Sequence, residues 1–384
     1  MTEPERGFPR AEFVDRTAGA QTAMARQGLA ALFLTKPQDI QYITGFLTRF
    51  WESPTRPWYV IVPASGDPVA VIPGIGAHLM GQGWVTDIRT WAAPDYDDDG
   101  IGLLAETIAE LVPPSGAMGV PSAMESHLRM PLADWERLKA LAAPRVFRDD
   151  ALILRHLRMV KSPREIDRIR AACAIADRAF ARVPEIAREG VPLSQVFRHF
   201  QMLCLDEGAD WVSYLAGASA RGGYGDVISP ASDRPLAAGD VLMLDTGLVR
   251  DGYFCDFDRN FAIGHAAPET RAAHTRLLDA TGAAFSATRP GATAADLFHA
   301  MAPVLGLDGA GGGGRLGHGL GLNLTEWPSL IPEDHTVLEP GMVLTLEPGI
   351  ETGPGRMLVH EENIVVTETG ADWLSSPTAD LPVI

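Results

Sequence analysis

Two strand-like segments joined by a tight turn constrain the fold of this 384-residue chain more than any other feature. Residues 241–248 and 253–263 are rich in apolar side chains, as strands packed in a core are. The dipeptide Asp251-Gly252 between them is a strong signal for a two-residue β-hairpin turn. The pattern therefore predicts an antiparallel sheet built around this hairpin.

Three carboxylates are expected on one face of the hairpin. In the simplest register Asp245 lies opposite Asp258, and Asp256 lies diagonally to Asp245 at about 7 to 8 Å, although one bulge would change that pairing. Residues 241–244 are apolar and leave little water to stabilise anions, so several carboxylates there would cost several kcal/mol or become protonated. Bound cations would remove that cost. The alternative is an exposed hairpin edge that carries ordinary acids.

Three further candidate ligands follow in the last third of the chain. His318 lies between two glycines, which allow a backbone to bring an imidazole close to a crowded centre. Glu347 ends one apolar run, and Glu361 interrupts a second. A lone histidine or acid would be weak evidence, whereas the whole set is hard to dismiss as coincidence. The candidate metal ligands are Asp245, Asp256, His318, Glu347 and Glu361.

The ligand types indicate the metal and the chemistry. Oxygen-rich ligation with one imidazole suits manganese, iron, cobalt or zinc, and manganese is our first choice. Two divalent ions about 3.5 to 4 Å apart can activate a water molecule and polarise the carbonyl of an amide. The set predicts metal-dependent hydrolysis, with Glu347 as the catalytic residue that passes the proton.

Composition excludes several classes of partner. The chain has 32 basic and 49 acidic side chains, a net charge of −17, which disfavours nucleic acid and anionic membranes. No apolar run approaches the roughly 18 residues that span a bilayer, and the first thirty residues contain no uninterrupted apolar core of signal-peptide length. Only three cysteines are present, which suits a reducing compartment. We expect a cytoplasmic protein.

Length and pattern predict two domains. Helix and strand signals alternate in an α/β domain over residues 1–155. A second domain over residues 156–384 has its first long helix at Ser162-Pro163, an N-cap followed by a first-turn proline, and this helix is expected to reach about residue 186. Other helices are expected at about 10–27, 102–111, 151–159, 193–205, 268–288 and 294–305.

At the five candidate ligands the chain resembles the pita-bread metallopeptidase family, which includes methionine aminopeptidase, aminopeptidase P, prolidase and the metal-free relative creatinase. The order Asp, Asp eleven residues on, His, Glu and Glu is highly specific. Residues 157–162 are similar to the linker of the prolidase and creatinase branch, and residues 41–46 resemble its N-terminal domain. The resemblance implies an α/β (α+β) chain with a creatinase-like N-terminal domain and a pita-bread catalytic domain. It also implies a homodimer whose partner N-domain borders the active site.

The sequence departs from the proline-specific members of that family. Those members have a second histidine seven residues after the ligand histidine, where this chain has Thr325, and another before the first aspartate, whereas residues 214–240 contain none. Asp258 stands where relatives commonly have threonine, and would tune the metals or bind a cationic substrate. Trp51 and Arg56 would recognise a carboxylate or stack on a cation, unless their segment is only a structural loop. The candidate substrate-binding residues are therefore Thr325, Asp258, Trp51 and Arg56.

Three functions are compatible with these observations. The first is a Xaa-Pro dipeptidase-like or aminopeptidase-like hydrolase acting on a small peptide. The second is a hydrolase or lyase for a small zwitterion, as in family members that open ectoine or cleave dimethylsulfoniopropionate, and the missing histidines motivate it. The third is a non-enzymatic binding protein, which the complete ligand set disfavours.

Overall fold

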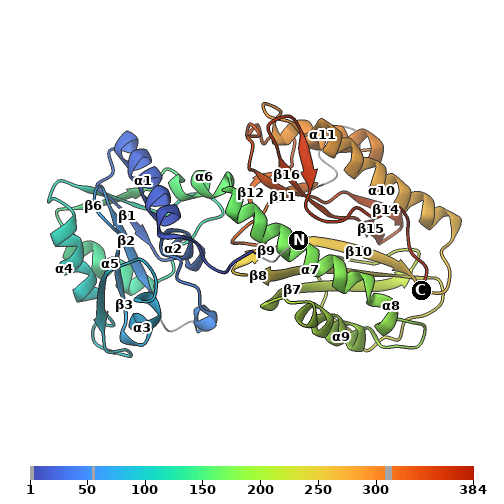
Figure 1. Ribbon diagram of the computed structural model, residues 1–384, viewed down its shortest axis with the longest axis horizontal. Coiled ribbons are helices and arrows are strands. Elements are labelled where there is room, and N and C mark those ends of the chain that lie inside the picture. Colours follow the sequence, from blue (N-terminus) through green and yellow to red (C-terminus); the bar gives the residue numbers. More distant parts are fainter. Residues whose placement is uncertain (1–3, 54–56, 308–313) are drawn as a thin grey trace. The chain divides into compact units, whose positions relative to one another are not determined.

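The computed structural model describes residues 4–53, 57–307 and 314–384. The chain folds into two compact units (Figure 1). One unit is formed by Arg6–Arg158, and the other comprises Met159–Ile384 with the described residues before Arg6. No helix in the described part of the chain combines the length and the apolar character that crossing a bilayer requires.

The N-terminal unit is built on one six-stranded mixed sheet in the order β4-β3-β2-β1-β5-β6. The pairs β1/β2 and β2/β3 are antiparallel, and the pairs β1/β5, β3/β4 and β5/β6 are parallel. The strands are β1 Ala31–Leu34, β2 Tyr59–Pro63, β3 Val69–Pro73, β4 Asp87–Trp91, β5 Ala117–Val120 and β6 Val146–Asp149. The helices are α1 Arg10–Gln27, α2 Pro37–Thr44, α3 Ala77–Met80, α4 Ile101–Leu111, α5 Leu132–Ala142 and α6 Ile153–Met159, with short 3-10 turns η1 Arg49–Glu52 and η2 Gly74–Gly76.

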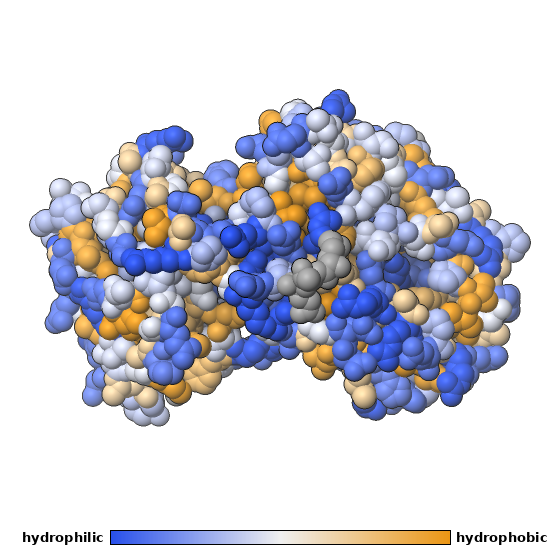
Figure 2. Space-filling model, viewed as in Figure 1, coloured by the Kyte–Doolittle hydropathy of each residue, from blue (hydrophilic) through white to orange (hydrophobic). Residues whose placement is uncertain are grey.

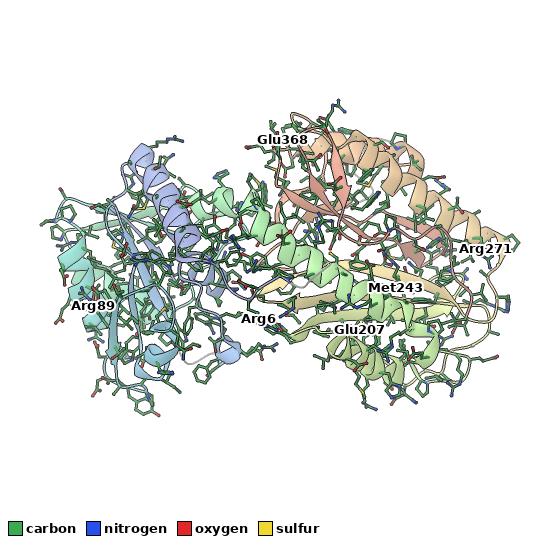
Figure 3. The ribbon with its side chains drawn as sticks, in the orientation of Figure 1. Arg6, Arg89, Glu207, Met243, Arg271 and Glu368 are labelled. Atoms are coloured by element: carbon green, nitrogen blue, oxygen red, sulfur yellow. The ribbon has the colours of Figure 1, made fainter. Side chains whose placement is uncertain are left out.

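Local sequence explains the limits of these elements. The inner strands β1, β2 and β3 are buried along their whole length, so they read as continuous apolar runs. Helix α1 ends at Gly28, whose positive φ of 63° is the left-handed conformation that glycine adopts without strain. On the sheet edge Arg89, labelled in Figure 3, forms ion pairs with Asp87 and Glu110. The unit thus has an apolar centre and a charged rim.

The second unit contains two antiparallel sheets and a separate two-stranded hairpin. The first sheet has the order β10-β8-β7, with β9 paired to β8, and the second has the order β12-β11-β13-β16-β17. The strands of the first are β7 Trp211–Arg221, β8 Asp240–Arg250, β9 Tyr253–Phe254 and β10 Phe257–Ala262. Those of the second are β11 Gly317–Gly319, β12 Glu326–Ser329, β13 Val343–Leu346, β16 Glu362–Val366 and β17 Ala371–Trp373, and β14 Gly349–Gly353 pairs with β15 Arg356–Val359.

Helices pack against both sheets. The helices are α7 Pro163–Ala181, α8 Val183–Ile186, α9 Leu193–Asp206, α10 Pro268–Ala287 and α11 Ala294–Leu305. Helices α7 and α9 contact the first sheet, whereas α10 and α11 pair with each other and α10 covers the β14–β15 hairpin. Figure 2 shows hydrophilic residues gathered over α8 and α9, where Arg182 forms ion pairs with Glu185, Asp206 and Glu207.

The first long helix of this unit differs from the prediction at its end. Its expected start is confirmed, because the Ser162 hydroxyl accepts the Glu165 N–H and the Glu165 carboxylate accepts the Ser162 N–H in a capping box. The helix stops at Ala181 instead of continuing to residue 186, and a short separate helix α8 follows. Pro184 explains the break, since proline has no N–H to donate and its ring clashes with the preceding turn.

The predicted hairpin is present in the expected register, but its second strand is split into β9 and β10 instead of running through residues 253–263. Asp258 lies opposite Asp245 in the β10/β8 pairing, and Arg250 lies opposite Tyr253 beside the turn. The turn residues Asp251 and Gly252 have positive φ angles of 52° and 82°, as a type I′ turn requires. The hairpin therefore holds its carboxylates in a fixed relation on a buried strand pair.

Candidate metal centre

The five candidate ligands come from two sheets and from the links between strands. Asp245 lies on β8, and Asp256 lies in the short link between β9 and β10. His318 is the middle residue of β11, and Glu347 directly follows β13. Glu361 lies in the link where the chain leaves β15 and enters β16, and not within a single strand as its apolar neighbours suggested. Met243, labelled in Figure 3, marks β8 two residues before Asp245.

These residues approach one another in two overlapping groups. Asp245, Asp256 and Glu361 each offer one carboxylate oxygen, and these oxygens lie within 4.8 Å of one another. His318 Nε2 lies 3.3 Å from Asp256 Oδ2 and 3.5 Å from Glu347 Oε2. Asp256 belongs to both groups, so the five side chains surround one continuous polar site.

Two glycines admit the imidazole of His318 to this site. A Cβ atom at Gly317 would lie 2.3 Å from the Thr345 carbonyl oxygen, and one at Gly319 would lie 2.2 Å from that of Trp327. Neither position can hold a larger residue without moving a neighbouring strand. The His318 Nδ1 atom lies 2.8 Å from the Gly319 carbonyl oxygen, which leaves Nε2 facing the carboxylates.

Burial makes the cluster unfavourable as a set of anions. Burial raises the pKa of Asp245 and of Glu361 well above the ordinary range, and repulsion from the neighbouring carboxylates raises each further. Burial also raises the pKa of Asp256, although His318 opposes that rise. The three carboxylates therefore repel one another when all of them are ionised.

Unpaired oxygen atoms show that the donor set fits a cation. Asp245 Oδ1 and Glu361 Oε2 are buried, and neither has a hydrogen-bond partner among the residues that the structure describes. A buried carboxylate oxygen without a donor is costly, because it has lost its water and gained nothing in return. Divalent cations would satisfy both atoms, and carboxylate oxygens with one imidazole are ligands that such cations accept.

Asn363 on β16 holds the backbone of Asp256. Its side-chain oxygen accepts the Asp256 N–H at 2.9 Å, and its amide nitrogen donates to the Asp256 carbonyl oxygen. Cys173 on α7 donates to the same side-chain oxygen. The asparagine is fully buried. This contact joins the two sheets at the site, and the sequence offered no local signal for it.

Asp258 is placed differently from the other two hairpin acids. It is fully buried, its Oδ1 accepts the Glu361 N–H at 2.6 Å, and its Oδ2 accepts from the Asn260 amide at 2.8 Å. Both oxygens are thus occupied by protein groups. Binding of a cationic substrate by Asp258 stays a prediction, and its contacts in the fold point toward the backbone of Glu361.

The remaining predicted substrate-binding residues are Thr325, Trp51 and Arg56. Thr325 is exposed in the bend before β12. Trp51 belongs to the N-terminal unit, where its ring packs edge-on against Phe46 and Trp58. Arg56 falls outside the described residues. The role of all three in substrate binding is untested.

Two residues near the site were not identified from the sequence. Tyr214 on β7 places its hydroxyl beside Asp245, and burial together with the charge of Asp245 raises the pKa of the phenol. Arg315 donates from Nε to Glu347 Oε1 at 3.1 Å, and about a third of its side chain is exposed. Tyr214 lies in a strand with weak sequence signals, and Arg315 follows a glycine-rich tract, so neither had a local pattern that would have revealed it.

Comparisons with known proteins place this site in context. A sequence model of metallopeptidase family M24 matches residues 167–368, and a model of the creatinase/prolidase N-terminal domain matches residues 16–160. A relative named probable dipeptidase PepE, from Mycobacterium tuberculosis, is 34% identical over 390 residues, which cover 99% of this chain and 98% of the relative.

Solved structures give the same picture. Dipeptidase PepE from Mycobacterium ulcerans has a TM-score of 0.83 and 31% sequence identity, and the match covers 98% of this chain and 99% of that one. The prolidase from Pyrococcus horikoshii OT3 has a TM-score of 0.82 at 24% identity, with coverage of 96% and 99%. At the latter identity the likeness shows the fold alone.

Proposed function

Because the chain belongs to metallopeptidase family M24, we propose that it uses a pair of divalent metal ions to hydrolyse an amide bond in a small peptide. Membership makes the protein a metal-dependent hydrolase of the peptidase type. It also confirms the expected architecture, a creatinase-like N-terminal domain followed by a pita-bread catalytic domain. The exact domain limits, 1–155 and 156–384, stay a prediction.

The five clustered side chains are the proposed metal ligands. Asp245 and Glu361 would serve one side of the site, His318 and Glu347 the other, and Asp256 both, since it belongs to the two groups described above. The single observation that carries this proposal is the pair of buried carboxylate oxygens without a protein donor, on Asp245 and Glu361. We propose manganese as the metal, with iron, cobalt or zinc as alternatives.

The residues divide the work of hydrolysis between them. When bound, divalent cations lower the pKa of water and polarise the carbonyl of the scissile amide. Glu347 would take the proton from the attacking water and deliver it to the leaving amine nitrogen. It suits this role because it is the least buried of the five and because Arg315 holds its Oε1 atom, which fixes the orientation of the carboxylate.

Substrate recognition is proposed from the rim of the site. The partly exposed guanidinium of Arg315 keeps further N–H groups that can donate to the terminal carboxylate of a dipeptide. A dipeptide fits the names of two relatives described above, which are dipeptidases. Thr325, Trp51 and Arg56 remain additional candidates for substrate contacts, and a homodimer remains the proposed assembly.

A second candidate function keeps the metal site and changes the substrate to a small zwitterion. The observation that favours it is the absence of histidine from residues 214–240 and from position 325, where the proline-specific members carry imidazoles. Asp258 gives this alternative little additional support, since both its oxygens are bound inside the protein. A hydrolase or lyase for ectoine-like or dimethylsulfoniopropionate-like compounds is therefore the second choice.

A substrate panel tests both functions. The purified chain is stripped with a chelator, reloaded with manganese and offered dipeptides with and without proline in the second position, beside zwitterionic osmolytes. We expect turnover of at least one dipeptide that disappears after stripping. Turnover of osmolytes alone would favour the alternative, and no turnover of any peptide by the reloaded protein would reject the peptidase assignment.

A further inference from the structure

The backbone around Glu361 leaves one sheet and enters another. Strand β15 ends at Val359 in the two-stranded hairpin, and β16 starts at Glu362 in the five-stranded sheet. A chain that changes sheets loses ladder partners at the crossing, and buried N–H and C=O groups must then find other partners. The groups of Val359 and Glu361 find them on side chains of two other segments of the unit, at Tyr224 and on strand β10.

Four buried side chains take over these backbone groups, those of Tyr224, Asn260, Asp258 and Arg259. The Val359 N–H donates to the Tyr224 hydroxyl at 2.8 Å, and the Val359 carbonyl oxygen accepts from the Asn260 amide at 2.7 Å. The Glu361 N–H donates to Asp258 Oδ1 at 2.6 Å. The neighbouring Glu361 carbonyl oxygen accepts from the Arg259 guanidinium at 3.1 Å. Strand β10 therefore forms hydrogen bonds to the backbone of Val359 and of Glu361, on both sides of the crossing between the two sheets.

Three of these side chains, Tyr224, Asn260 and Asp258, also bind one another, which fixes their orientation. The Tyr224 hydroxyl donates to Asn260 Oδ1 at 3.0 Å while it accepts from the backbone. The Asn260 amide nitrogen donates to Asp258 Oδ2 at 2.8 Å with one hydrogen and to the Val359 carbonyl oxygen with the other. Reversing the asparagine amide would place its oxygen against two other acceptors, the Asp258 carboxylate and the Val359 carbonyl oxygen, so only one arrangement satisfies every group.

Burial makes this arrangement stiff. Tyr224 and Asp258 are fully buried, and Asn260 is 2% exposed. Breaking one of these bonds would leave a donor or acceptor without water, which costs more than the bond itself contributes. A polar network that is complete and dry holds the segment it binds in a single conformation.

The carboxylate of Glu361 depends on this support. Its Oε2 atom has no hydrogen-bond partner among the described residues, so the held backbone sets where the side chain starts. Asp258 is absent from the group of oxygens that lie within 4.8 Å of one another, although it is two residues from Asp256. Asp258 instead accepts the Glu361 N–H, so it supports the backbone of Glu361.

We propose that Tyr224, Asn260 and Asp258 form a positioning network that holds Glu361 in place for metal binding. The inference rests on the proposed function, because it takes Glu361 as a metal ligand. Partners that orient metal ligands commonly contribute about 10- to 100-fold in metal affinity. The network therefore sets metal affinity although none of its side chains is a ligand.

Removal of one hydroxyl group tests the network. Tyr224→Phe deletes only the oxygen that joins Val359 to Asn260, and we expect manganese to bind the stripped chain about 10-fold more weakly than wild type. The affinity is measured on the intact chain by competition with a chromogenic chelator, at a temperature well below unfolding. Asp258→Ala removes the hydrogen bond to the Glu361 N–H directly, and we expect it to lose more manganese affinity than Tyr224→Phe.

Tyr253→Phe is the matched control. Tyr253 is also buried, in the same unit, and its hydroxyl donates to Glu165 Oε1 at 2.9 Å. Both variants lose a buried hydroxyl group and should lose stability in chelator, but only Tyr224→Phe should lose metal affinity. Equal affinities for Tyr224→Phe and wild type, or an equal loss in the control, would overturn the inference while the proposed function stands. A wild-type chain that binds no manganese would overturn both.

Discussion

Replacing Asp245 by asparagine should change stability in opposite directions with and without metal. Asp245 is buried, one of its oxygens has no partner, and the nearest oxygens of Asp256 and Glu361 lie within 4.8 Å. In the metal-free protein the Asp245→Asn side chain keeps the shape and removes one of three mutually repelling charges. In the loaded protein the same change removes a proposed ligand.

The structure gives the size of both effects. Two unit charges 4.8 Å apart repel by about 3.5 kcal/mol at an effective dielectric constant of about 20. Burial raises the pKa of Asp245, so partial protonation already relieves some of this repulsion, and we expect a net gain of about 1 to 2 kcal/mol. Metal at about 100 times its dissociation constant stabilises wild type by about 2.7 kcal/mol, which the variant largely forgoes.

Thermal unfolding measures the reversal. For a unit of this size each kcal/mol moves the midpoint by about 2 to 4 °C, so Asp245→Asn should melt about 2 to 8 °C above wild type in chelator and below it in manganese. Asp240→Asn is the control, because Asp240 is equally buried but accepts hydrogen bonds from Arg234, Ser219 and the Ala237 N–H. That variant should be destabilised in both solutions. If Asp245→Asn also melts below wild type in chelator, the description of the site as a repelling cluster is incorrect.

Three further outcomes are expected. Gly319→Ala places a methyl group against a neighbouring carbonyl oxygen, so it should cost about 1 to 3 kcal/mol of stability and weaken metal binding. Unfolding and chelator competition measure the two effects. An alanine that changes neither would contradict the tight fit around His318. Arg315→Gln should raise KM for dipeptides with a free terminal carboxylate and change KM little for amidated ones, and equal effects on both would exclude carboxylate recognition. Burial lowers the pKa of His274 to about 4. As the pH falls, the unfolded chain therefore binds a proton at this residue before the folded chain does. The free energy of unfolding that depends on the neutral ring is fully present above about pH 6.5 and decreases by up to about 3 kcal/mol toward pH 4. Denaturant titrations of wild type and His274→Gln across that range should converge at low pH, and parallel curves would refute this assignment.

Several elements could be predicted because residues close together in the sequence determine where they begin and end. The hairpin register followed from the Asp251-Gly252 turn and from the alternation of side chains, and it places Asp245 opposite Asp258 as expected. Thr293 is the N-cap of helix α11, and its side chain forms a capping box with Asp296. Such signals involve residues two to four apart, which is the range that a single sequence reports well.

Other elements lacked a local signal because tertiary packing determines them. Strand β7 contains Gly217, where a Cβ atom would lie 2.5 Å from the Met243 carbonyl oxygen and 2.8 Å from the Phe197 ring. The close approach demands a residue that favours no strand, so the pattern was weak. Helix α2 was overlooked for a related reason, since its eight residues are too few to show a helical period.

The candidate ligands could be found from the sequence, but their supports could not. Buried acids and a glycine-flanked histidine are conspicuous in apolar runs. The contacts of Asn363 with Asp256 and of Asp258 with Glu361 join segments that are about a hundred residues apart, and no spacing rule connects them. The sequence therefore predicts that Asp258 tunes the metals or binds substrate, whereas its carboxylate accepts a hydrogen bond from the backbone of Glu361, a proposed ligand.

Metal stoichiometry tests the central claim most directly. The account predicts that the stripped wild-type chain takes up two manganese ions per chain in equilibrium dialysis, and that Asp256→Ala takes up neither with comparable affinity, because Asp256 belongs to both groups of oxygens. Wild-type protein that binds no divalent ion, or an Asp256→Ala variant that binds as wild type does, would contradict it.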